Sequence, residues 1–380
     1  MKFTAEKSSL VSCLVGASDI ARSISENDSS RYILKNIKLE VKNNILTSTG
    51  TDADTVIKNR IPVFAENDGE VAILGQLIDD VIKKFDDGAE VVLEYKEEEN
   101  LLYVNSGKSK FKLNCISSET FPSFEEQNMI GNFTVVREDF INLIDKTRFA
   151  ASDDAAKYYL NGMYLHTIKE DDTMNLVAVG TDGHKLAVAK LAYFNGEEDL
   201  RGIIVPRKTL PEIKKILVSN VGDKEIEVSF SKTKIKIQTS RSTIISKLID
   251  ADFPDYRRVI PAENDKTLQC EKIALIKSIN RVASIVSEAH KGIKFIINDK
   301  NVLVIDASCA KNGSASEEVS VEFDSDAKVE IAFNSKNLLE ILSQIESDKV
   351  VFTIRDNFCA AIIRGSEETN DTFILMPVRI

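Results

Sequence analysis

The feature that most constrains the fold is a repetition of short motifs along the chain. Gly-Thr-Asp occurs at residues 50–52 and again at 180–182, and Phe-Pro occurs at 121–122 and, after nearly the same interval, at 253–254. Pro377 follows in a similar setting. Motifs that recur in one order at a nearly fixed interval indicate repeated structural units. These intervals are far longer than those of solenoid repeats, so we expect three similar domains.

The starts of the three segments share a second pattern. In each, a short β-like start leads into a stretch with apolar residues at helical spacing. The matching sets are Phe3, Leu10 and Leu14, then Phe133, Phe140 and Ile144, and then Leu268, Leu275 and Ile279. We therefore place the domains at residues 1–127, 129–255 and 257–380.

Each segment is predicted to contain both helices and strands. Apolar residues at helical spacing predict two helices per repeat, over residues 8–19, 76–85, 137–149, 210–218, 272–286 and 336–345. Alternating polar and apolar residues predict strands, among them 38–41, 91–95, 101–104, 225–230, 234–239 and 350–354. The expected fold class is α+β, with three similar domains that each pack two helices on antiparallel sheet.

Composition and charge narrow the class of protein. The chain has 43% hydrophobic and 29% charged residues, as is typical of soluble globular proteins. No stretch approaches the roughly 18 apolar residues of a membrane span, and the first residues suggest no secretory signal. Five scattered cysteines without a C-x-x-C pair are expected to be reduced thiols in a cytoplasmic protein. The net charge of −11 disfavours nucleic acid as a partner unless basic side chains gather on one face.

The motifs of common catalytic sites are missing from the sequence. It contains neither a P-loop nor a G-x-S-x-G motif, and its three histidines lack metal-site spacing. We expect no catalytic residue, no metal and no cofactor. Asp182-Gly183-His184 could form a catalytic dyad, but a structural turn is the better interpretation, because glycine favours tight turns. Two alternatives stay open: a hydrolase or transferase that uses Asp182 and His184, and an acidic structural oligomer without a DNA role.

Several segments resemble the bacterial sliding clamp, the beta subunit of DNA polymerase III. The resemblance covers the whole chain, and its middle part is the most specific. The segments that carry it are Lys-Tyr-Tyr-Leu-Asn-Gly-Met at 157–163, Gly-Thr-Asp-Gly-His-Lys-Leu-Ala-Val at 180–188, Ile-Val-Pro-Arg-Lys at 204–208, Asp-Phe-Pro-Asp-Tyr-Arg-Arg-Val-Ile-Pro at 252–261, and the ends Met-Lys-Phe-Thr and Met-Pro-Val-Arg-Ile.

The resemblance implies a closed ring, built as a head-to-tail homodimer of the DNA clamp fold. It also implies a processivity factor of the nucleoid-associated replication machinery, without catalysis of its own. Its partners would be duplex DNA without sequence specificity, the replicative polymerase catalytic subunit and the clamp loader. Other DNA polymerases and repair proteins would bind through a short peptide motif, and no membrane is involved.

A ring can be acidic outside and mildly basic where helices line its hole, which would reconcile the net charge with DNA. Twelve basic residues were placed on candidate helices: Lys7, Lys83, Lys84, Arg137, Lys146, Arg148, Arg207, Lys208, Lys214, Lys215, Lys277 and Arg281. The expected DNA contacts are Arg207, Lys208, Tyr158 and Tyr159. Residues 23–31 diverge from the family's basic loop, and Asp154 replaces a neutral amide, so neither is carried over as a contact.

The resemblance further implies a surface pocket for the peptide motif of partners. Apolar residues would supply its floor and a few polar groups would orient the peptide. The matching positions are Leu160, Thr181, Gly183, His184, Lys185, Leu186, Pro254, Arg258, Val259, Met376, Pro377, Val378, Arg379 and Ile380. Lys185 replaces an arginine that is frequent in the family, so the charge is kept and the planar fork is lost.

A ring also needs an interface between its chains. Lys108, Lys110 and Lys112 alternate along residues 107–113, so one strand face would carry all three. We expect this first-domain strand to pair with a third-domain strand of the second chain that carries alternating glutamates. The expected interface residues are Lys108, Lys110, Phe111, Leu113, Ile285, Val286, Glu318 and Glu322.

Overall fold

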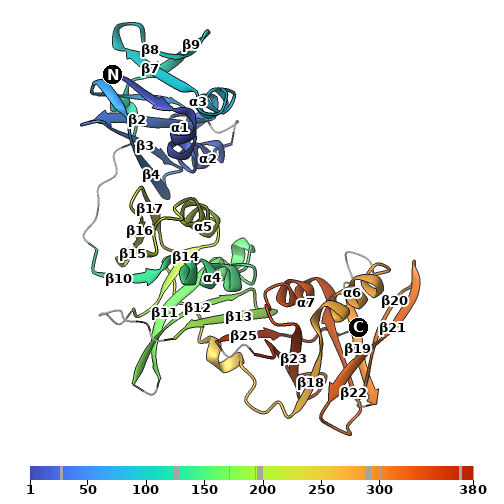
Figure 1. The fold of residues 1–380 in the computed structure, drawn as a ribbon. Coiled ribbons are helices and arrows are strands. Elements are labelled where there is room, and N and C mark those ends of the chain that lie inside the picture. Colours follow the sequence, from blue (N-terminus) through green and yellow to red (C-terminus); the bar gives the residue numbers. More distant parts are fainter. Residues whose placement is uncertain are drawn as a thin grey trace. The chain divides into compact units, whose positions relative to one another are not determined.

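The fold is that of a computed structural model. The structure describes residues 1–25, 29–122, 129–170, 172–192, 194, 200–286, 292–299, 301–367 and 370–379. The chain forms two compact units, each built around its own sheet (Figure 1). The first unit comprises residues 1–141, 195–198 and 208–248, and the second comprises residues 142–194, 199–207 and 249–380.

The first unit contains a 13-stranded sheet in its described residues, in the order β10-β15-β16-β17-β4-β3-β2-β6-β9-β8-β7-β1-β5. Its strands are β1 (Lys2–Glu6), β2 (Asn36–Lys42), β3 (Ile45–Thr51), β4 (Thr55–Pro62), β5 (Phe64–Asn67), β6 (Gly69–Leu74), β7 (Glu90–Lys96), β8 (Leu101–Ser106), β9 (Ser109–Ile116), β10 (Gly131–Val136), β15 (Glu225–Phe230), β16 (Lys234–Gln238) and β17 (Ser242–Lys247). Its helices are α1 (Lys7–Leu14), α2 (Ala17–Arg22), α3 (Gly75–Lys83) and α5 (Leu210–Ser219).

The second unit contains a 12-stranded sheet in the described part, in the order β14-β11-β12-β13-β25-β24-β23-β18-β21-β20-β19-β22. Its strands are β11 (Gly162–Glu170), β12 (Thr173–Thr181), β13 (Lys185–Leu191), β14 (Ile203–Pro206), β18 (Lys266–Glu271), β19 (Gly292–Asp299), β20 (Val302–Cys309), β21 (Gly313–Phe323), β22 (Val329–Asn334), β23 (Lys349–Ile354), β24 (Ala361–Gly365) and β25 (Asp371–Leu375). Its helices are α6 (Lys272–Ala283) and α7 (Ser335–Leu342), and α4 (Arg137–Arg148) begins in the first unit and ends in the second.

Five of the six predicted helices are confirmed, and the sixth needs a correction. The stretch 8–19 was expected to be a single helix, but it forms α1 and α2, which are separated at Val15 and Gly16. Gly16 has a φ of 78°, a left-handed conformation that cannot continue a helix and that glycine adopts at little cost. The expected β-strands 225–230 and 350–354 are also present, the second one residue longer.

The threefold repetition is visible in the register of the strands. In each repeat the first strand pairs with a later one, and a row of directly opposed apolar residues runs across four strands. The rows are Phe3–Leu93–Val104–Phe111, Phe133–Val228–Ile237–Ile244 and Leu268–Phe352–Ile363–Phe373. The three segment starts matched in the sequence therefore occupy equivalent positions in three equivalent sheets.

Two of these rows continue into the neighbouring repeat. Ile244 of β17 lies opposite Ile57 of β4, and Phe373 of β25 lies opposite Ala187 of β13. We call these two antiparallel pairings the joints. Both join the last strand of one repeat to the strand that follows the Gly-Thr-Asp turn of another, and both use the same register.

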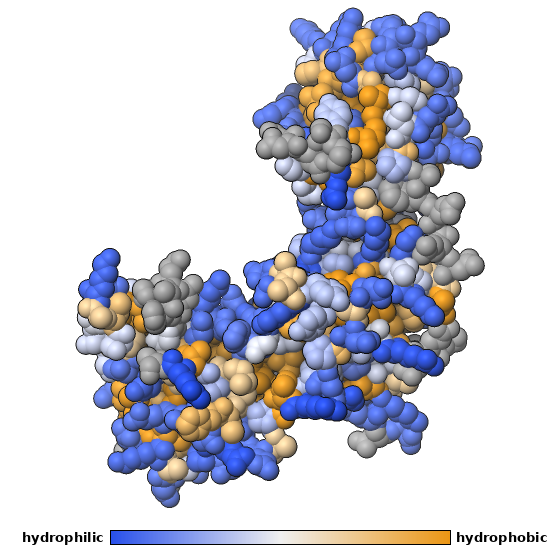
Figure 2. Space-filling view, turned by 180° about the vertical axis from the view of Figure 1, so that it is seen from behind, coloured by the Kyte–Doolittle hydropathy of each residue, from blue (hydrophilic) through white to orange (hydrophobic). Residues whose placement is uncertain are grey.

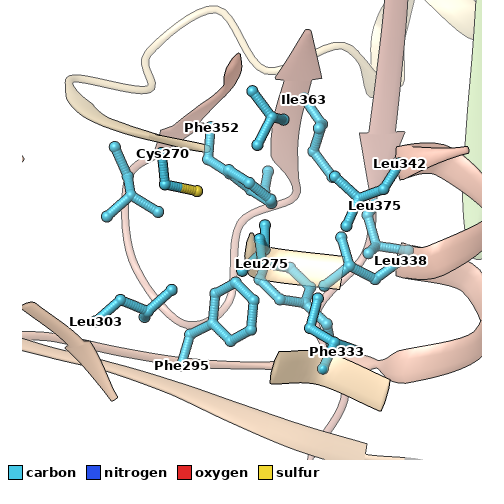
Figure 3. Packing of buried hydrophobic residues seen from close by; sticks show 14 of the residues in the cluster. Cys270, Leu275, Phe295, Leu303, Phe333, Leu338, Leu342, Phe352, Ile363 and Leu375 are labelled. Atoms are coloured by element: carbon cyan, nitrogen blue, oxygen red, sulfur yellow. The ribbon is translucent and has the colours of Figure 1, made fainter. Parts of the chain in front are cut away.

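Each unit packs its helices on one face of its sheet around a buried apolar core. In the first unit, Phe3, Leu10 and Ile78 are among the fully buried side chains. In the second, Phe295, Phe333 and Phe352 converge with leucines of α6 and α7 (Figure 3). Hydrophilic residues dominate the face that Figure 2 shows, as the composition predicts. In the parts of the chain that the structure describes, no helix is long and apolar enough to span a bilayer.

The repeated Gly-Thr-Asp motif forms the same turn twice. In the first copy Asp52 Oδ1 accepts hydrogen bonds from the amides of Asp54 and Thr55 (3.0 and 2.7 Å). In the second copy Asp182 Oδ1 accepts them from His184 and Lys185 (2.7 and 2.9 Å). The residue after each aspartate has a positive φ. The motif is therefore a structural turn.

The glycine of each motif permits a helix to approach the sheet. A Cβ at Gly50 would lie 2.1 Å from the carbonyl oxygen of Ala17, and one at Gly180 would lie 2.2 Å from that of Thr147. Both distances are far below van der Waals contact, and both obstacles are backbone atoms, which cannot rotate away. Only glycine fits at either position without displacing the helix.

We predict that Gly50→Ala or Gly180→Ala destabilises the fold by about 1–3 kcal/mol, because the added methyl group overpacks the helix–sheet contact. Gly222→Ala is the matched control, since nothing lies within 4 Å of a Cβ there and its φ lies outside the left-handed region. Denaturant unfolding followed by circular dichroism measures the difference. Equal midpoints for all three variants would contradict the close approach.

Candidate functional site

The joint between β13 and β25 is the site where most of the predicted pocket residues meet. Lys185 lies opposite Leu375, and Leu186 lies opposite Ile374. The chain then leaves β25 and runs beside the turn before β13, where the amide of Met376 donates to the carbonyl of His184 (2.9 Å). Residues far apart in the sequence are thus brought to one place by backbone pairing.

The last described residues are held in place by the sheet. The amide of Val378 donates to the carbonyl of Ala332 on β22 (2.8 Å). Pro377 and Val378 are half-buried, whereas Arg379 is exposed. These backbone hydrogen bonds anchor residues 376–378 to the sheet, so this segment is not a free tail. Ile380 lies outside the described residues.

Lys185 is the polar centre of the site. Its side chain is only 8% exposed. Its Nζ lies 2.9 Å from Asp182 Oδ2 and 3.1 Å from Glu340 Oε2, and it donates to Asn337 Oδ1 at 3.3 Å. A buried ammonium group needs such partners, because an unpaired charge in a protein interior is costly. Lys185 therefore ties the turn at 181–185 to α7 rather than pointing freely into a pocket.

Asp182 is fully engaged in the turn. Burial alone would raise the pKa of its carboxyl group, but the Lys185 ammonium and the amides of Lys185 and His184 outweigh that effect and lower the pKa. Thr181 Oγ1 donates to the carbonyl of Lys185 (2.7 Å) and accepts from the amide of Gly183 (3.1 Å). His184 is exposed. This geometry gives Asp182 a structural role.

The apolar part of the site combines buried and exposed residues. Leu160 and Leu186 are buried, with 5% and 3% exposure. Leu186 belongs to a small core cluster with Tyr256 and Ile374. Val259 and Met376, by contrast, are 56% and 41% exposed, which is unusual for large apolar side chains.

The remaining predicted pocket residues lie on the segment around the short helix Tyr256–Val259. Pro254 and Arg258 are both exposed. The Nε of Arg258 donates to Asp255 Oδ2 (3.2 Å), and Asp255 also accepts from Arg257. The structure thus brings buried leucines and exposed apolar and basic residues together in one unit.

Two residues of this site were missed from the sequence. Asn337 and Glu340 belong to α7 and contact Lys185, but helix periodicity only marked α7 as amphipathic. Nothing in the local sequence distinguishes these two polar residues from others on a solvated helix face. Their role depends on pairing across the joint, which the sequence does not reveal.

The predicted DNA contacts lie at two places. Tyr158 is 56% exposed and packs edge-on against Tyr159, with ring centroids 5.9 Å apart. Arg207 belongs to the same unit and lies 3.4 Å from Asp153. Lys208 belongs to the first unit, where its Nζ lies 2.7 Å from Asp54 Oδ2 and 3.4 Å from Asp52 Oδ2.

Some basic residues do not lie where the sequence placed them. Arg207 and Lys208 lie in the turn before α5, not on a helix. Arg137 is 8% exposed and donates to the carbonyls of Leu217 and Asp223. Lys146 is 8% exposed and pairs with Glu346 and Asp371. The last two are buried structural cations, so a helical position alone did not predict exposure.

The predicted interface residues occupy two strand edges. Lys110, Phe111 and Leu113 lie on β9, whereas Lys108 lies in the turn before it and is not a strand residue as expected. Phe111 packs edge-on against Phe85, with centroids 5.7 Å apart. Lys108 and Lys110 are exposed.

On the other edge, Glu318 and Glu322 both lie on β21. Glu318 is opposite Val304, in the part that pairs with β20, whereas Glu322 pairs with Gln269 of β18. Ile285 and Val286 are partly buried against the C-terminal core. Among the described residues, no group of three or more His, Cys, Asp or Glu side chains is arranged to hold a metal ion.

Models of the DNA polymerase III beta subunit match the whole of this architecture. The N-terminal domain model matches residues 1–125, the central domain model 134–255 and the C-terminal domain model 257–379. The beta sliding clamps of Caulobacter vibrioides and Pseudomonas aeruginosa are 31% and 30% identical over 382 and 381 residues, with 100% of both chains covered in each case.

Solved structures of the same family also superpose on this chain over its full length. The DnaN sliding clamp of Bartonella birtlesii, solved bound to griselimycin, superposes with a TM-score of 0.94 at 30% identity and full coverage of both chains. The DNA polymerase III subunit beta of Pseudomonas aeruginosa gives a TM-score of 0.91 at 29% identity, again with full coverage.

Three repeated α+β sheets joined edge to edge define a DNA clamp. The chain belongs to the DNA polymerase III beta subunit family, the beta sliding clamps. It is a processivity subunit that works with DNA and a polymerase, and it is not itself catalytic. The alternatives of a hydrolase that uses Asp182 and His184 and of an oligomer without a DNA role are therefore wrong.

The lowered pKa of Asp182 predicts a pH-dependent contribution to stability. Its charged form stabilises the fold above the ordinary aspartate pKa of about 3.9, and this contribution is lost as the pH falls through the lower folded pKa. At pH 7, Asp182→Asn should cost about 1–3 kcal/mol, since it removes a charged hydrogen-bond partner of buried Lys185.

The difference in unfolding free energy between wild type and Asp182→Asn should shrink as the pH falls below the ordinary aspartate pKa and through the lowered pKa of folded Asp182. Denaturant titrations across this range measure it. Asp172→Asn serves as the control, because Asp172 has a 97% exposed side chain paired only with exposed Lys169. A gap that persists unchanged at low pH would show that the charge of Asp182 is not what stabilises the turn.

Proposed function

We propose that two copies of this chain close head to tail into a ring that encircles duplex DNA and tethers the replicative polymerase. In this proposal the three domains comprise residues 1–127, 129–255 and 257–380, and the ring works in the cytoplasm on the nucleoid. The observation that carries the proposal is the repeated joint. Each joint uses the last strand of one repeat and the strand after the Gly-Thr-Asp turn of another.

Strand β9, the last of the first repeat, and strand β21 of the third repeat, which corresponds to β4 and β13, each have an edge that is largely unpaired in the described residues. In the described residues, β9 pairs with β8 over Ser109–Asn114, and it pairs with β6 only at Cys115 and Ile116. β21 pairs with β20 over Gly313–Ser320, and its other edge pairs with β18 only from Val321 onward. Unpaired strand edges are ready templates for a further strand. A second copy can supply the missing partner at both ends, which closes a ring.

The common register predicts the pairing in this third joint. Phe111 is equivalent to Ile244 and Phe373, as the three rows of opposed residues show. Ala315 lies opposite Ala307, as Ile57 lies opposite Gly50 and Ala187 opposite Gly180. Phe111 of one chain should therefore lie opposite Ala315 of the other.

The same antiparallel register places Lys110 opposite Ser316 and diagonal to Glu318. Lys108, in the turn that precedes β9, lies beyond the paired strand at the level of Glu318. Exposed ion pairs are worth only about 0–1 kcal/mol each, so Phe111, Leu113, Ile285 and Val286 should contribute most of the affinity. Glu322 takes no part in this joint, because β18 already occupies its edge.

Cross-linking tests the register directly. A variant with Phe111→Cys and Ala315→Cys should form covalent dimers on mild oxidation, seen on a non-reducing gel. The control pairs Phe111→Cys with Ser316→Cys, which moves the thiol by one residue and onto the other face of the sheet. Equal cross-linking in both variants, or in neither, would contradict the predicted register. Charge reversal at Lys108 and Lys110 should also shift sedimentation towards monomers.

We also propose that the site beside the β13–β25 joint receives a short peptide motif from the polymerase, the clamp loader and repair proteins. The support is its composition. Exposed apolar side chains of Val259 and Met376 lie in one unit with buried Leu160 and Leu186, and the exposed side chains of His184 and Arg258 can orient a peptide. Apolar floors with few polar groups are typical of such sites.

Val259→Ala combined with Met376→Ala should weaken binding of such a peptide at least about tenfold, because truncation of anchoring residues typically costs more than 1 kcal/mol each. Short overlapping peptides from the cognate polymerase, screened by fluorescence anisotropy, supply the probe. Ile273→Ala is the control, since Ile273 is as exposed (57%) but lies on α6. If Ile273→Ala lost peptide binding and the double variant kept it, the peptide would not bind at Val259 and Met376, and the proposed position of the site would be wrong.

For DNA we propose contacts from Arg207, Lys208, Tyr158 and Tyr159 to phosphates rather than bases. The support is that Tyr158 and Lys208 are exposed, and that nearby carboxylates partly neutralise the charges of Arg207 and Lys208. Lys208 holds two carboxylates, and its hydrogen bond lowers the pKa of Asp54. Cations paired in this way attract phosphate weakly and in a salt-dependent manner, which suits a protein that must slide.

Topology is the property that separates a ring from ordinary contact binding. After loading by a cognate clamp loader with ATP, the protein should stay on circular DNA and be lost from the ends of linear DNA. Gel filtration of the labelled protein with each DNA measures retention. Equal retention on both forms would mean contact binding, and the ring would have to be abandoned.

A further inference from the structure

A cavity beside the proposed partner-peptide site borders the segment that carries Pro254, Arg258 and Val259. It has a volume of about 390 Å³, and its walls come from β11, from the chain at Leu200 and Arg201, and from residues 253–257. Pro254 lines this cavity and is also a predicted residue of the partner-peptide site. The two sites are therefore neighbours that share Pro254.

The floor of the cavity is a stack of aromatic rings. Tyr164 lies parallel to Phe253, with centroids 4.7 Å apart and an interplanar angle of 2°, and it also stacks on His166 at 4.8 Å. His166 Nε2 lies 3.1 Å from the hydroxyl of Tyr256. His166 and Tyr256 are 7% and 8% exposed. These contacts make a rigid floor, so the cavity does not depend on a loop closing over it.

Arg201 and Arg257 supply positive charge to the cavity. Both are exposed, and Arg257 uses only its Nε to bind Asp255 Oδ1 (3.0 Å). Arg201 has no side-chain hydrogen bond or ion pair with any residue that the structure describes. The terminal guanidinium nitrogens of both residues are therefore available, and Asp255, the one carboxylate of the lining, is already bound by Arg257 and Arg258.

We propose that this cavity binds acidic residues that flank the motif held in the partner-peptide site, so that Arg201 and Arg257 select partners with a carboxylate beside their motif. The inference rests on the proposed function of that neighbouring site. Charge complementarity favours a carboxylate, because guanidinium groups bind carboxylates with paired hydrogen bonds. Continuity through Pro254 favours a flank of the same peptide over an unrelated ligand.

The test uses the tightest-binding peptide from the overlapping polymerase series, resynthesised with two glutamates, two serines or two lysines added at either end. On the full-length protein, the glutamate version should bind about 5-fold more tightly than the serine version, as expected for one or two exposed ion pairs. Arg201→Ala should remove this advantage and leave the affinity for the serine version unchanged. Arg201→Glu should instead favour the lysine version.

The double variant Lys232→Ala, Lys328→Ala is the matched control, since it removes two exposed cations elsewhere. It should keep the preference for glutamate. If no peptide binds, or if Val259→Ala and Met376→Ala leave binding intact, the proposed partner-peptide site fails. If the peptide binds there but glutamates add nothing, or Arg201→Ala keeps their advantage, the present inference alone is overturned.

The aromatic floor leaves single-stranded DNA as a competing occupant, because bases stack on such rings. A labelled thymidine oligonucleotide decides between the two. We expect no difference in oligonucleotide binding between wild type and Arg201→Ala. Loss of oligonucleotide binding in Arg201→Ala, with no effect on the glutamate preference, would assign the cavity to nucleic acid and overturn the proposal.

Discussion

Antiparallel pairing between strands of different repeats is the interaction on which the rest of the structure depends. The pairings β17–β4 and β25–β13 join four smaller sheets into two large ones. Each replaces two exposed edges, whose amide and carbonyl groups would otherwise be open to other chains, with a ladder of hydrogen bonds. The same pairing also assembles the proposed partner-peptide site, because it places residues 376–378 beside the turn that precedes β13.

The same Gly-Thr-Asp turn occurs at both joints, but the residue that ends the turn contacts different groups in each. The aspartate and the threonine hold the backbone in the same conformation in both copies, and the glycine lets a helix approach. What differs is the residue that ends the turn. At the first joint Thr55 lies in a buried cluster of hydroxyl groups with Thr209 and Ser246. At the second, Lys185 draws α7 towards the turn, so one joint is closed by neutral groups and the other by a buried charge.

The sequence predicted the features that depend on local periodicity and on repetition. The helices, the equivalence of Phe3, Phe133 and Leu268, and the structural nature of the Gly-Thr-Asp turn all follow from spacing within a short window. The resemblance to a family added the positions of the pocket residues, and backbone pairing brings His184, Lys185, Leu186 and Met376 to one joint.

Features that depend on distant partners could not be predicted in this way. The break at Gly16 requires a backbone conformation that spacing does not encode. Arg137 and Lys146 looked like solvated helix residues, because the carbonyls and carboxylates that bury them come from other segments. Asn337 and Glu340 gain their role from Lys185, which lies in another repeat. Long-range pairing decides the cases of Arg137, Lys146, Asn337 and Glu340, whereas the break at Gly16 is set by its left-handed backbone conformation.

The equal register of the joints has a consequence for how a ring of this kind can open. A head-to-tail assembly closes only when the rotations between successive units add up to a full turn. Six domains that share this rotation equally need about 60° each. Small changes of twist at several joints therefore add up to a mismatch that is released at the weakest joint. A ring can then open at one joint while every other strand pair stays intact. In the proposed ring, the joints inside each chain are reinforced by the covalent chain itself, so such strain would be released at the seam between the two chains.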